Sequence, residues 1–197
     1  MFEFVEKIVY INLEHRTDRK AQIEDVLKHV SDKVIRFNAI KEEHGGIGCT
    51  KSHIAVLEMA IREGWKNYLV VEDDAVWNKF DTGYPILEKL VQTSYDVIVL
   101  GAVVQRIDRK TYKLYSGHTT TSYMVHSKYY RALLKNFKDG LDGFLTTGNY
   151  HAFAIDQYWK KLQPFDDWYC VAPSLLIQRE GFSDIENRVL NNGVYFI

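Results

Sequence analysis

The feature that most constrains the fold of this chain is an alternation of two hydrophobic periods over its first hundred residues. Short apolar runs rich in β-branched residues predict strands at 7–13, 33–40, 68–71 and 96–100. Between these runs, apolar residues recur at the three-to-four-residue spacing of a helix face. Strands that alternate with helices indicate an α/β layered domain with a mostly parallel sheet.

Residues with special backbone preferences predict where the helices begin and end. Thr17 is expected to cap the first helix, whose apolar face continues to Val30. The Gly-Gly-Ile-Gly run at 45–48 is expected to break the chain before a second helix, which Gly64 ends. Pro85 suits the first turn of a third helix.

After residue 101 the pattern changes. Short alternating segments over 103–125 predict hairpins, and helical spacing predicts helices at 127–137 and 155–162, the second stopped by Pro164. No internal repeat and no long linker divides the chain. A single domain with a differently built second half is therefore expected.

The charge balance and the cysteine content limit the classes of function. The chain has 25 Lys and Arg against 26 Asp and Glu, and this balance argues against a dedicated nucleic-acid surface. The two cysteines, Cys49 and Cys170, lack a CxxC companion and suit a reducing compartment. The N-terminus is acidic where a signal peptide is basic, and no apolar run approaches the ~18 residues that span a bilayer. A cytoplasmic protein without a transmembrane segment is expected.

The strongest chemical signal is the acidic triplet Glu72-Asp73-Asp74, which directly follows the strand expected at 68–71. Open α/β sheets bind ligands outside the carboxyl ends of their strands. Adjacent carboxylates repel one another, and a hard divalent cation such as Mg²⁺ or Mn²⁺ relieves that repulsion. The triplet thus indicates a site for a metal and a phosphate, which would also suit a nucleotidyltransferase or a phosphatase. The alternative is a solvated acidic turn.

Two further segments have residues suited to a nucleotide. One lies at the start of the second expected helix, where free N–H groups attract anions, and its candidate contacts are Lys51, Ser52 and His53. The other follows the first strand, and its candidate residues are Asn12, Arg16, Asp18 and Arg19. An ordinary capped helix and a charged helix start are the alternatives for the two segments.

Together these segments resemble glycosyltransferase family 25, which includes lipooligosaccharide galactosyltransferases and collagen galactosyltransferases. The resemblance covers about residues 7–186. The matching residues are Val9-Tyr10-Ile11-Asn12-Leu13 with Arg16 and Arg19, Gly48-Cys49 with Ser52-His53, Val71 with the acidic triplet, Thr120 to Val125, Ile155-Asp156, and Ser183-Asp184-Ile185. Thr50-Lys51 depart from the pattern, because small or apolar residues are more usual there, and this departure bears on the choice of donor.

The resemblance implies a GT-A fold, a Mn²⁺-type ion (or Mg²⁺) and a nucleotide-diphosphate sugar donor, with inversion at the anomeric carbon. The acidic triplet would be a DxD-like motif that holds the metal and the donor ribose, with Asp74 and Glu72 as metal ligands. His118, beside Gly117, is a further candidate ligand for the metal or a phosphate, and the alternative is an ordinary surface or hydrogen-bonded histidine. Gln178 is a weaker candidate. Within the single domain 1–197, about 1–100 would bind the nucleotide sugar and about 101–197 the acceptor. Most aromatic residues of this second part are expected in the core and one or two in the acceptor cleft; they are Tyr123, Tyr158, Trp159, Trp168 and Tyr169.

An inverting transfer requires a base that deprotonates the acceptor hydroxyl. Asp156 is the first candidate, because it matches the family's later aspartate motif and opens a helix in the second half. A plain N-cap aspartate is the alternative there. Asp184 is the second candidate.

The expected function is therefore metal-dependent transfer of a hexose (galactose, glucose or N-acetylglucosamine) from a UDP-sugar to a glycan, lipid-linked or protein-linked acceptor. One alternative is a nucleotidyltransferase, although residues 12–15 (Asn-Leu-Glu-His) stand where a glycine-rich loop with a basic residue would be expected. The other is a non-catalytic sugar-binding relative, and the intact acidic triplet counts against it.

Overall fold

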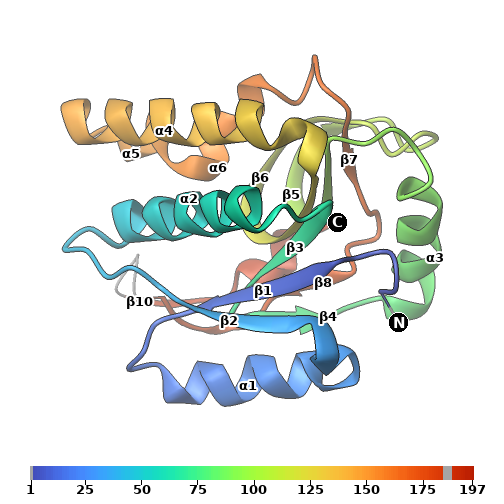
Figure 1. Cartoon of the computed structure of the whole chain (residues 1–197), viewed down its shortest axis with the longest axis horizontal. Helices are drawn as coiled ribbons and strands as arrows, with labels where there is room; N and C mark the ends of the chain where they lie inside the picture. The colour runs from blue at the N-terminus through green and yellow to red at the C-terminus, as the bar shows by residue number, and fades with distance from the viewer. Residues whose placement is uncertain (1, 184–187) are drawn as a thin grey trace.

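One six-stranded sheet forms the centre of the computed structural model, which describes residues 2–183 and 188–197 (Figure 1). The strands lie in the order β2-β1-β3-β6-β5-β7. Their bounds are β1 Lys7–Asn12, β2 Val34–Asn38, β3 Asn67–Glu72, β5 Val97–Ile107, β6 Leu114–His126 and β7 Trp168–Cys170. β6 runs antiparallel to both of its neighbours, and the other neighbouring pairs are parallel. The mostly parallel sheet predicted from the sequence is confirmed.

Helices cover both faces of the sheet, so the molecule has three layers (Figure 1). α1 (Thr17–Leu27) and α3 (Phe80–Leu90) pack on one face. α2 (Gly45–Glu63) and α4 (Tyr130–Thr147) pack on the other face and touch each other. The shorter helical elements are η1 Lys28–Lys33, η2 Ser127–Tyr129, α5 Tyr150–Phe153, α6 Ile155–Tyr158, η3 Trp159–Lys161 and η4 Asn192–Tyr195.

The two faces of the sheet are apolar because successive side chains of a strand point in opposite directions. In β3, Tyr68 and Val70 pack toward α2 and α4, whereas Leu69 and Val71 pack toward α1 and α3. Strands that are buried on both faces read as continuous apolar runs. The same alternation directs the next residue, Glu72, toward the α2 and α4 side.

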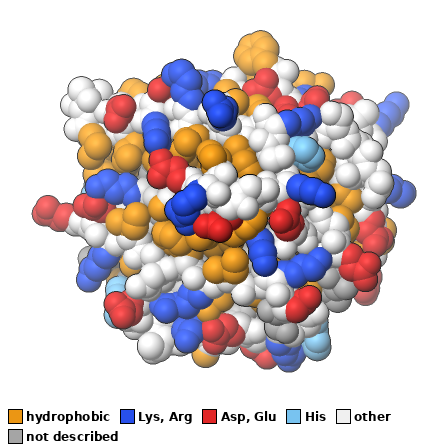
Figure 2. All heavy atoms as spheres, viewed as in Figure 1, with side chains coloured by type: hydrophobic (Ala, Val, Ile, Leu, Met, Phe, Trp, Pro, Cys, Tyr) orange, Lys and Arg blue, Asp and Glu red, His pale blue; other side chains and the backbone are white. Residues whose placement is uncertain are grey.

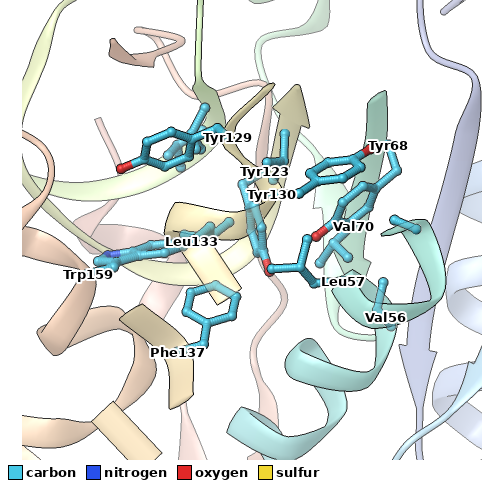
Figure 3. Packing of buried hydrophobic residues seen from close by; sticks show 14 of the residues in the cluster. Val56, Leu57, Tyr68, Val70, Tyr123, Tyr129, Tyr130, Leu133, Phe137 and Trp159 are labelled. Carbon is cyan, nitrogen blue, oxygen red and sulfur yellow. The ribbon is translucent and has the colours of Figure 1, made fainter. Parts of the chain in front are cut away.

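The layer between the sheet and α2 and α4 is rich in aromatic side chains. Figure 3 shows Tyr123 of β6 and Trp159 of η3 among Leu57 of α2 and Leu133 and Phe137 of α4. Tyr123 and Trp159 have no exposed surface. The packing of these large rings explains why the second half of the chain belongs to the same core as the first half.

Two small strand pairs lie beside the sheet in the described part of the chain. β4 (Ala75–Trp77) pairs with β8 (Leu176–Gln178), and β9 (Gly181–Ser183) pairs with β10 (Arg188–Leu190), each in antiparallel fashion. β8 also crosses β5 closely: a Cβ on Gly101 would lie 1.7 Å from the carbonyl oxygen of Leu176. This close approach requires glycine at position 101.

The prediction that residues 45–48 break the chain is wrong. α2 begins at Gly45, so these residues form its first turn, and the Nδ1 atom of His44 accepts a hydrogen bond from the N–H of Gly46 at 3.2 Å. The glycines serve close packing instead, because a Cβ on Gly48 would lie 2.5 Å from the carbonyl oxygen of Ile40. The predicted end at Gly64 is confirmed, with the left-handed φ of 70° that favours glycine.

The other predicted boundaries differ by a few residues. Arg16 is the N-cap residue of α1, so Thr17 is the first helical residue, and Val30 lies beyond the helix. Pro85 lies in the interior of α3. It therefore leaves the carbonyl group of Asp81 without its helical N–H donor. The segment 103–125 forms one long hairpin with 97–102, because β5 and β6 pair over most of their length.

The longer of the two late helices, α4, extends ten residues beyond its predicted end, to Thr147. The helix predicted over 155–162 is instead divided into α6 and η3.

The surface agrees with the balanced composition. On the face drawn in Figure 2, basic and acidic side chains are intermixed, without a large area of either charge. None of the helices within the described ranges combines the length and the apolar character needed to cross a bilayer.

Candidate active site

A cavity of about 760 Å³ opens at the carboxyl ends of β1 and β3. This volume lies within the range of small-molecule sites. Its wall includes the whole acidic triplet from the first half of the chain, together with His118, Asp156 and Gln178 from the second half. The triplet thus lies at the end of β3 and faces this cavity.

Glu72 is the last residue of β3 and points toward α2, as the strand alternation requires. Its Oε1 atom accepts a hydrogen bond from the Thr120 hydroxyl at 2.6 Å, and its Oε2 atom accepts one from Gln178 at 3.4 Å. The Nε2 atom of His53 lies 3.6 Å from Oε1. Burial raises the pKa of Glu72, but His53 and the two hydrogen-bond donors outweigh it and hold the pKa below its usual value. Glu72 is therefore an ionised carboxylate whose position is fixed by its hydrogen-bond donors.

Asp73 points in the opposite direction, toward α1. The side-chain N–H of Asn12 donates to its Oδ2 atom at 2.7 Å, and Arg19 donates to its Oδ1 atom at 2.9 Å. Asn12 is 1% exposed and is itself held by Arg36. Asn12 and Arg19, two of the predicted nucleotide contacts, thus fix the direction of Asp73.

Asp74 is the least compensated of the three acids. Arg19 lies 3.3 Å from its Oδ2 atom, whereas its buried Oδ1 atom has no hydrogen-bond partner among the described residues. Burial, and then the charges of Glu72 and Asp73, raise the pKa of Asp74 to about 7. A buried carboxylate oxygen without a hydrogen-bond donor is the kind of ligand that a hard divalent cation takes, and Glu72 is close enough for its charge to act on Asp74.

Asp156 joins the same cavity from α6. It is the second residue of that short helix, after the N-cap residue Ala154, and makes no capping hydrogen bond. The N-cap alternative is therefore wrong. Its Oδ2 atom accepts a hydrogen bond from the backbone N–H of Thr119 at 3.1 Å. Burial raises the pKa of Asp156, and the charge of Glu72 adds to this effect, while Thr119 and His118 oppose it.

His118, the further candidate ligand, lines the same cavity and contacts Gln105. Its Nδ1 atom is 2.6 Å from the side-chain nitrogen of Gln105, and the charge of Asp156 acts on its ring. Among the described residues, the group with metal-ligand proximity is instead Cys49, His53 and Glu72, whose ligand atoms all lie within 4.8 Å of one another. His118 thus shares the cavity with Glu72 and Asp74 but does not join the compact ligand group.

The nucleotide contacts predicted at a helix start are displaced, because α2 begins three residues earlier than position 48. The hydroxyl of Ser52 donates to the carbonyl oxygen of Gly48 and accepts from the N–H of Ile40, so it is engaged within the fold. Lys51 forms an ion pair with Glu42 at 2.5 Å. Arg16 pairs with Asp18 at 2.9 Å. Asn12, Arg16 and Lys51 are not among the described residues that line the cavity, whereas Arg19, Ser52 and His53 are.

Sequence reasoning missed several cavity residues of suitable chemistry. Basic groups come from His15, Lys41 and Arg188, and aromatic rings come from Tyr150 and Tyr195. They lie in loops and short elements without a motif, so no local pattern could have identified them. None of the five aromatic residues named from the sequence is among the described residues of the wall. Asp184, the second candidate base, lies outside the described residues.

No protein-family model matches the sequence, and no curated protein matches it. Solved structures do match. A glycosyltransferase involved in the glycosylation of the major capsid of PBCV-1 superposes with a TM-score of 0.55 at 10% identity, over 87% of this chain and 92% of that chain. A197 from STIV gives 0.49 at 12% identity, over 94% and 93% of the two chains. GlyE of Streptococcus pneumoniae TIGR4 gives 0.48 at 8% identity, over 85% and 45%. The first of these likenesses shows that the fold is that of GT-A type glycosyltransferases.

Proposed function

We propose that this chain is a metal-dependent, inverting glycosyltransferase, related to family 25, that moves a hexose from a UDP-sugar to a glycan, lipid-linked or protein-linked acceptor. The observation that carries the proposal is the meeting of the acidic triplet and Asp156 in one cavity of suitable size, on a glycosyltransferase-type fold. Transfer needs carboxylates that hold the metal at the donor and a carboxylate that accepts the proton of the acceptor. This cavity contains candidates for both roles. A cytoplasmic location is part of the proposal, which the two free thiols, Cys49 and Cys170, support.

Asp74 and Glu72 would hold a Mn²⁺ or Mg²⁺ ion. Support comes from the carboxylate oxygen of Asp74 that is buried without a donor. When bound, such an ion acts as a Lewis acid that neutralises the charge of the departing diphosphate. Asp73, fixed by Asn12 and Arg19, would be directed to the donor ribose.

The basic residues of the wall would bind the diphosphate. Arg19, Lys41 and Arg188 line the cavity together with the acidic triplet. Positive groups along a cleft raise the local concentration of an anionic ligand. Arg19 would have two roles, because it also holds Asp73 and Asp74 in place.

Asp156 would accept the proton of the acceptor hydroxyl. The oxygen of that hydroxyl would form a bond to the anomeric carbon as the bond to the diphosphate breaks on the opposite side, which inverts the configuration. Burial and the charge of Glu72 raise the pKa of Asp156, so its carboxylate is a stronger base than an exposed one. Asp184 remains the second proposed candidate for this role.

Calorimetry of UDP binding tests the metal-dependent donor site. UDP is expected to bind tightly in Mn²⁺ and at least about tenfold more weakly with a chelator, because the acidic triplet repels a naked diphosphate. Asp25→Asn is a matched control, since Asp25 is a 74% exposed carboxylate that is not among the described residues of the cavity wall, and this variant should bind UDP like the original chain. Equal UDP affinity with and without the ion would overturn the metal role.

A further inference from the structure

We propose that Cys49, His53 and Glu72 bind a zinc ion through a thiolate sulfur, the imidazole Nε2 atom and a carboxylate oxygen. Their ligand atoms all lie within 4.8 Å of one another. This trio differs in chemistry from the oxygen-only set of the acidic triplet. The inference goes beyond the proposed transferase activity and does not rest on it, because it concerns the folded chain and a metal alone.

The elements of the fold explain why these three side chains meet. Cys49 and His53 are four residues apart on α2, which puts them on one face of the helix. That helix packs on the sheet beside β3, and the alternation of β3 directs Glu72 toward it. His53 is 1% exposed, and Cys49 is half-buried at the cavity wall. The trio is therefore set by rigid elements and not by loops.

A contact with Tyr123 orients the imidazole of His53. Its Nδ1 atom lies 2.8 Å from the hydroxyl of Tyr123, whose side chain is fully buried. Ligating histidines usually engage the ring nitrogen that is not bound to the metal in this way, which fixes the tautomer and the ring direction. When Nδ1 carries the proton and donates it to the Tyr123 hydroxyl, the lone pair of Nε2 is available to an ion.

The spacing between the ligand atoms of His53 and Glu72 also suits an ion. The 3.6 Å between Nε2 of His53 and Oε1 of Glu72 is longer than a hydrogen bond. Two ligand atoms that each lie about 2.0 Å from a tetrahedral zinc are about 3.3 Å apart. A small adjustment of the Glu72 side chain would therefore bring these two atoms to coordination distance. The sulfur of Cys49, which lies within 4.8 Å of both, would complete the site by a rotation of its own side chain.

The mixed set of sulfur, nitrogen and oxygen ligands favours zinc over manganese or magnesium, which prefer oxygen. Three protein ligands leave a fourth position for water, and that position would face the cavity. Binding would exchange the thiol proton of Cys49 for the ion and release the proton to solvent. Since Glu72 also belongs to the acidic triplet, zinc and a hard cation would share this carboxylate.

Titration of the intact chain with Co²⁺, a spectroscopic substitute for Zn²⁺, tests the proposal. We expect a thiolate-to-cobalt charge-transfer band that saturates at one equivalent and that Zn²⁺ removes. Cys49→Ala should abolish the band, whereas the matched variant Cys170→Ala should keep it, because Cys170 is the other thiol and lies buried away from the cavity. Absence of the band, or an equal band in Cys49→Ala, would overturn the proposal.

A second measurement needs no substitution, so it tests zinc binding at Cys49 even if Cys49→Ala does not fold. Alkylation of Cys49 in the original chain is followed by mass spectrometry, with Zn²⁺, with Mn²⁺ and with neither ion. Because alkylation needs a free thiolate, Zn²⁺ should slow it by at least about tenfold and Mn²⁺ should not. An unchanged rate in Zn²⁺, or equal protection by both ions, would contradict a zinc site at Cys49.

Discussion

At the scale of single residues, three consecutive acids have three different environments. Glu72 is hydrogen-bonded and ionised, Asp73 is held by Asn12 and Arg19, and Asp74 has a buried oxygen without a donor among the described residues. A carboxylate that is left uncompensated in a fold destabilises that fold unless a cation relieves it. The proposed metal would therefore remove the destabilisation that the uncompensated Asp74 carboxylate causes.

Asp74→Asn should stabilise the metal-free chain at pH 8 while it abolishes transfer. The pKa of Asp74 is raised to about 7 from 3.8, so the folded state binds the proton more tightly than the unfolded state. The contribution of this group to stability is thus present at low pH and is lost as the pH rises from about 4 to about 7. At pH 8 the variant should gain on the order of 1–3 kcal/mol.

Thermal melts at pH 4 and pH 8 in chelator test this expectation. The gain should vanish near pH 4, where the Asp74 carboxyl of the folded chain is neutral. Asp25→Asn should show neither effect, because its carboxyl is exposed. A variant that melts below the original chain at pH 8 would show that the charge of Asp74 is compensated.

Asp156→Asn should reduce transfer by roughly a hundred- to ten-thousand-fold, the usual cost of losing a general base. An asparagine oxygen can still accept the hydrogen bond from the Thr119 N–H, so the local structure should persist. UDP affinity should remain within a few-fold of the original value. Initial-rate measurements give the transfer rate and calorimetry gives the UDP affinity of the same preparation. If the transfer rate stays near that of the original chain, Asp156 is not the base and Asp184 becomes the next candidate.

At the scale of elements, the site depends on close approaches that glycine permits. β8 brings Gln178 to Glu72 because β5 has no Cβ at Gly101, where the carbonyl group of Leu176 passes. α2 brings Cys49 and His53 to the cavity because Gly48 lets its first turn pack against Ile40. These close approaches therefore allow α2, β3 and β8 to contribute side chains to the same cavity.

Gly101→Ala should destabilise the chain by about 3 kcal/mol or more, since the added carbon would overlap backbone that cannot move alone. Gly181→Ala is the matched control, because a Cβ there meets nothing within 4 Å. Urea unfolding of both variants measures the difference. A Gly101→Ala variant as stable as the control would mean that β8 can move away from β5, and UDP binding would then report whether the site moved with it.

At the scale of the whole molecule, the two halves of the chain form one folding unit. β6 from the second half lies between β3 and β5, and β4 pairs with β8. The cavity wall also draws on both halves. The boundary near residue 100 therefore separates the donor and acceptor roles of the proposed function. It does not separate two structural units.

A fragment of residues 1–95 should not fold cooperatively, because β3 would lose β6 and become an uncovered edge of apolar side chains. Circular dichroism during heating should show no sharp transition for this fragment and one transition for the intact chain. A sharp transition in the fragment would instead indicate an independent nucleotide-sugar domain.

The sequence by itself determined the layered α/β fold and the place of the acidic triplet. Both depend on local patterns: apolar runs of strand length, helical spacing between them, and carboxylates directly after Val71. Local periodicity decides which residues are buried, and it also places Glu72 and Asp73 on opposite sides of the sheet once the strand is known. Fold class and strand-end chemistry could therefore be predicted.

Only the tertiary structure decided which residues share the cavity. Pairing of β6 between β3 and β5 brings Thr120 to Glu72, and the fold of α6 brings Asp156 to the same wall, across many residues of chain. Lys51 and Arg16, suitable by type, are engaged with Glu42 and Asp18 instead. These outcomes depend on long-range packing and on competition among charged partners, and neither leaves a periodic signal in the sequence.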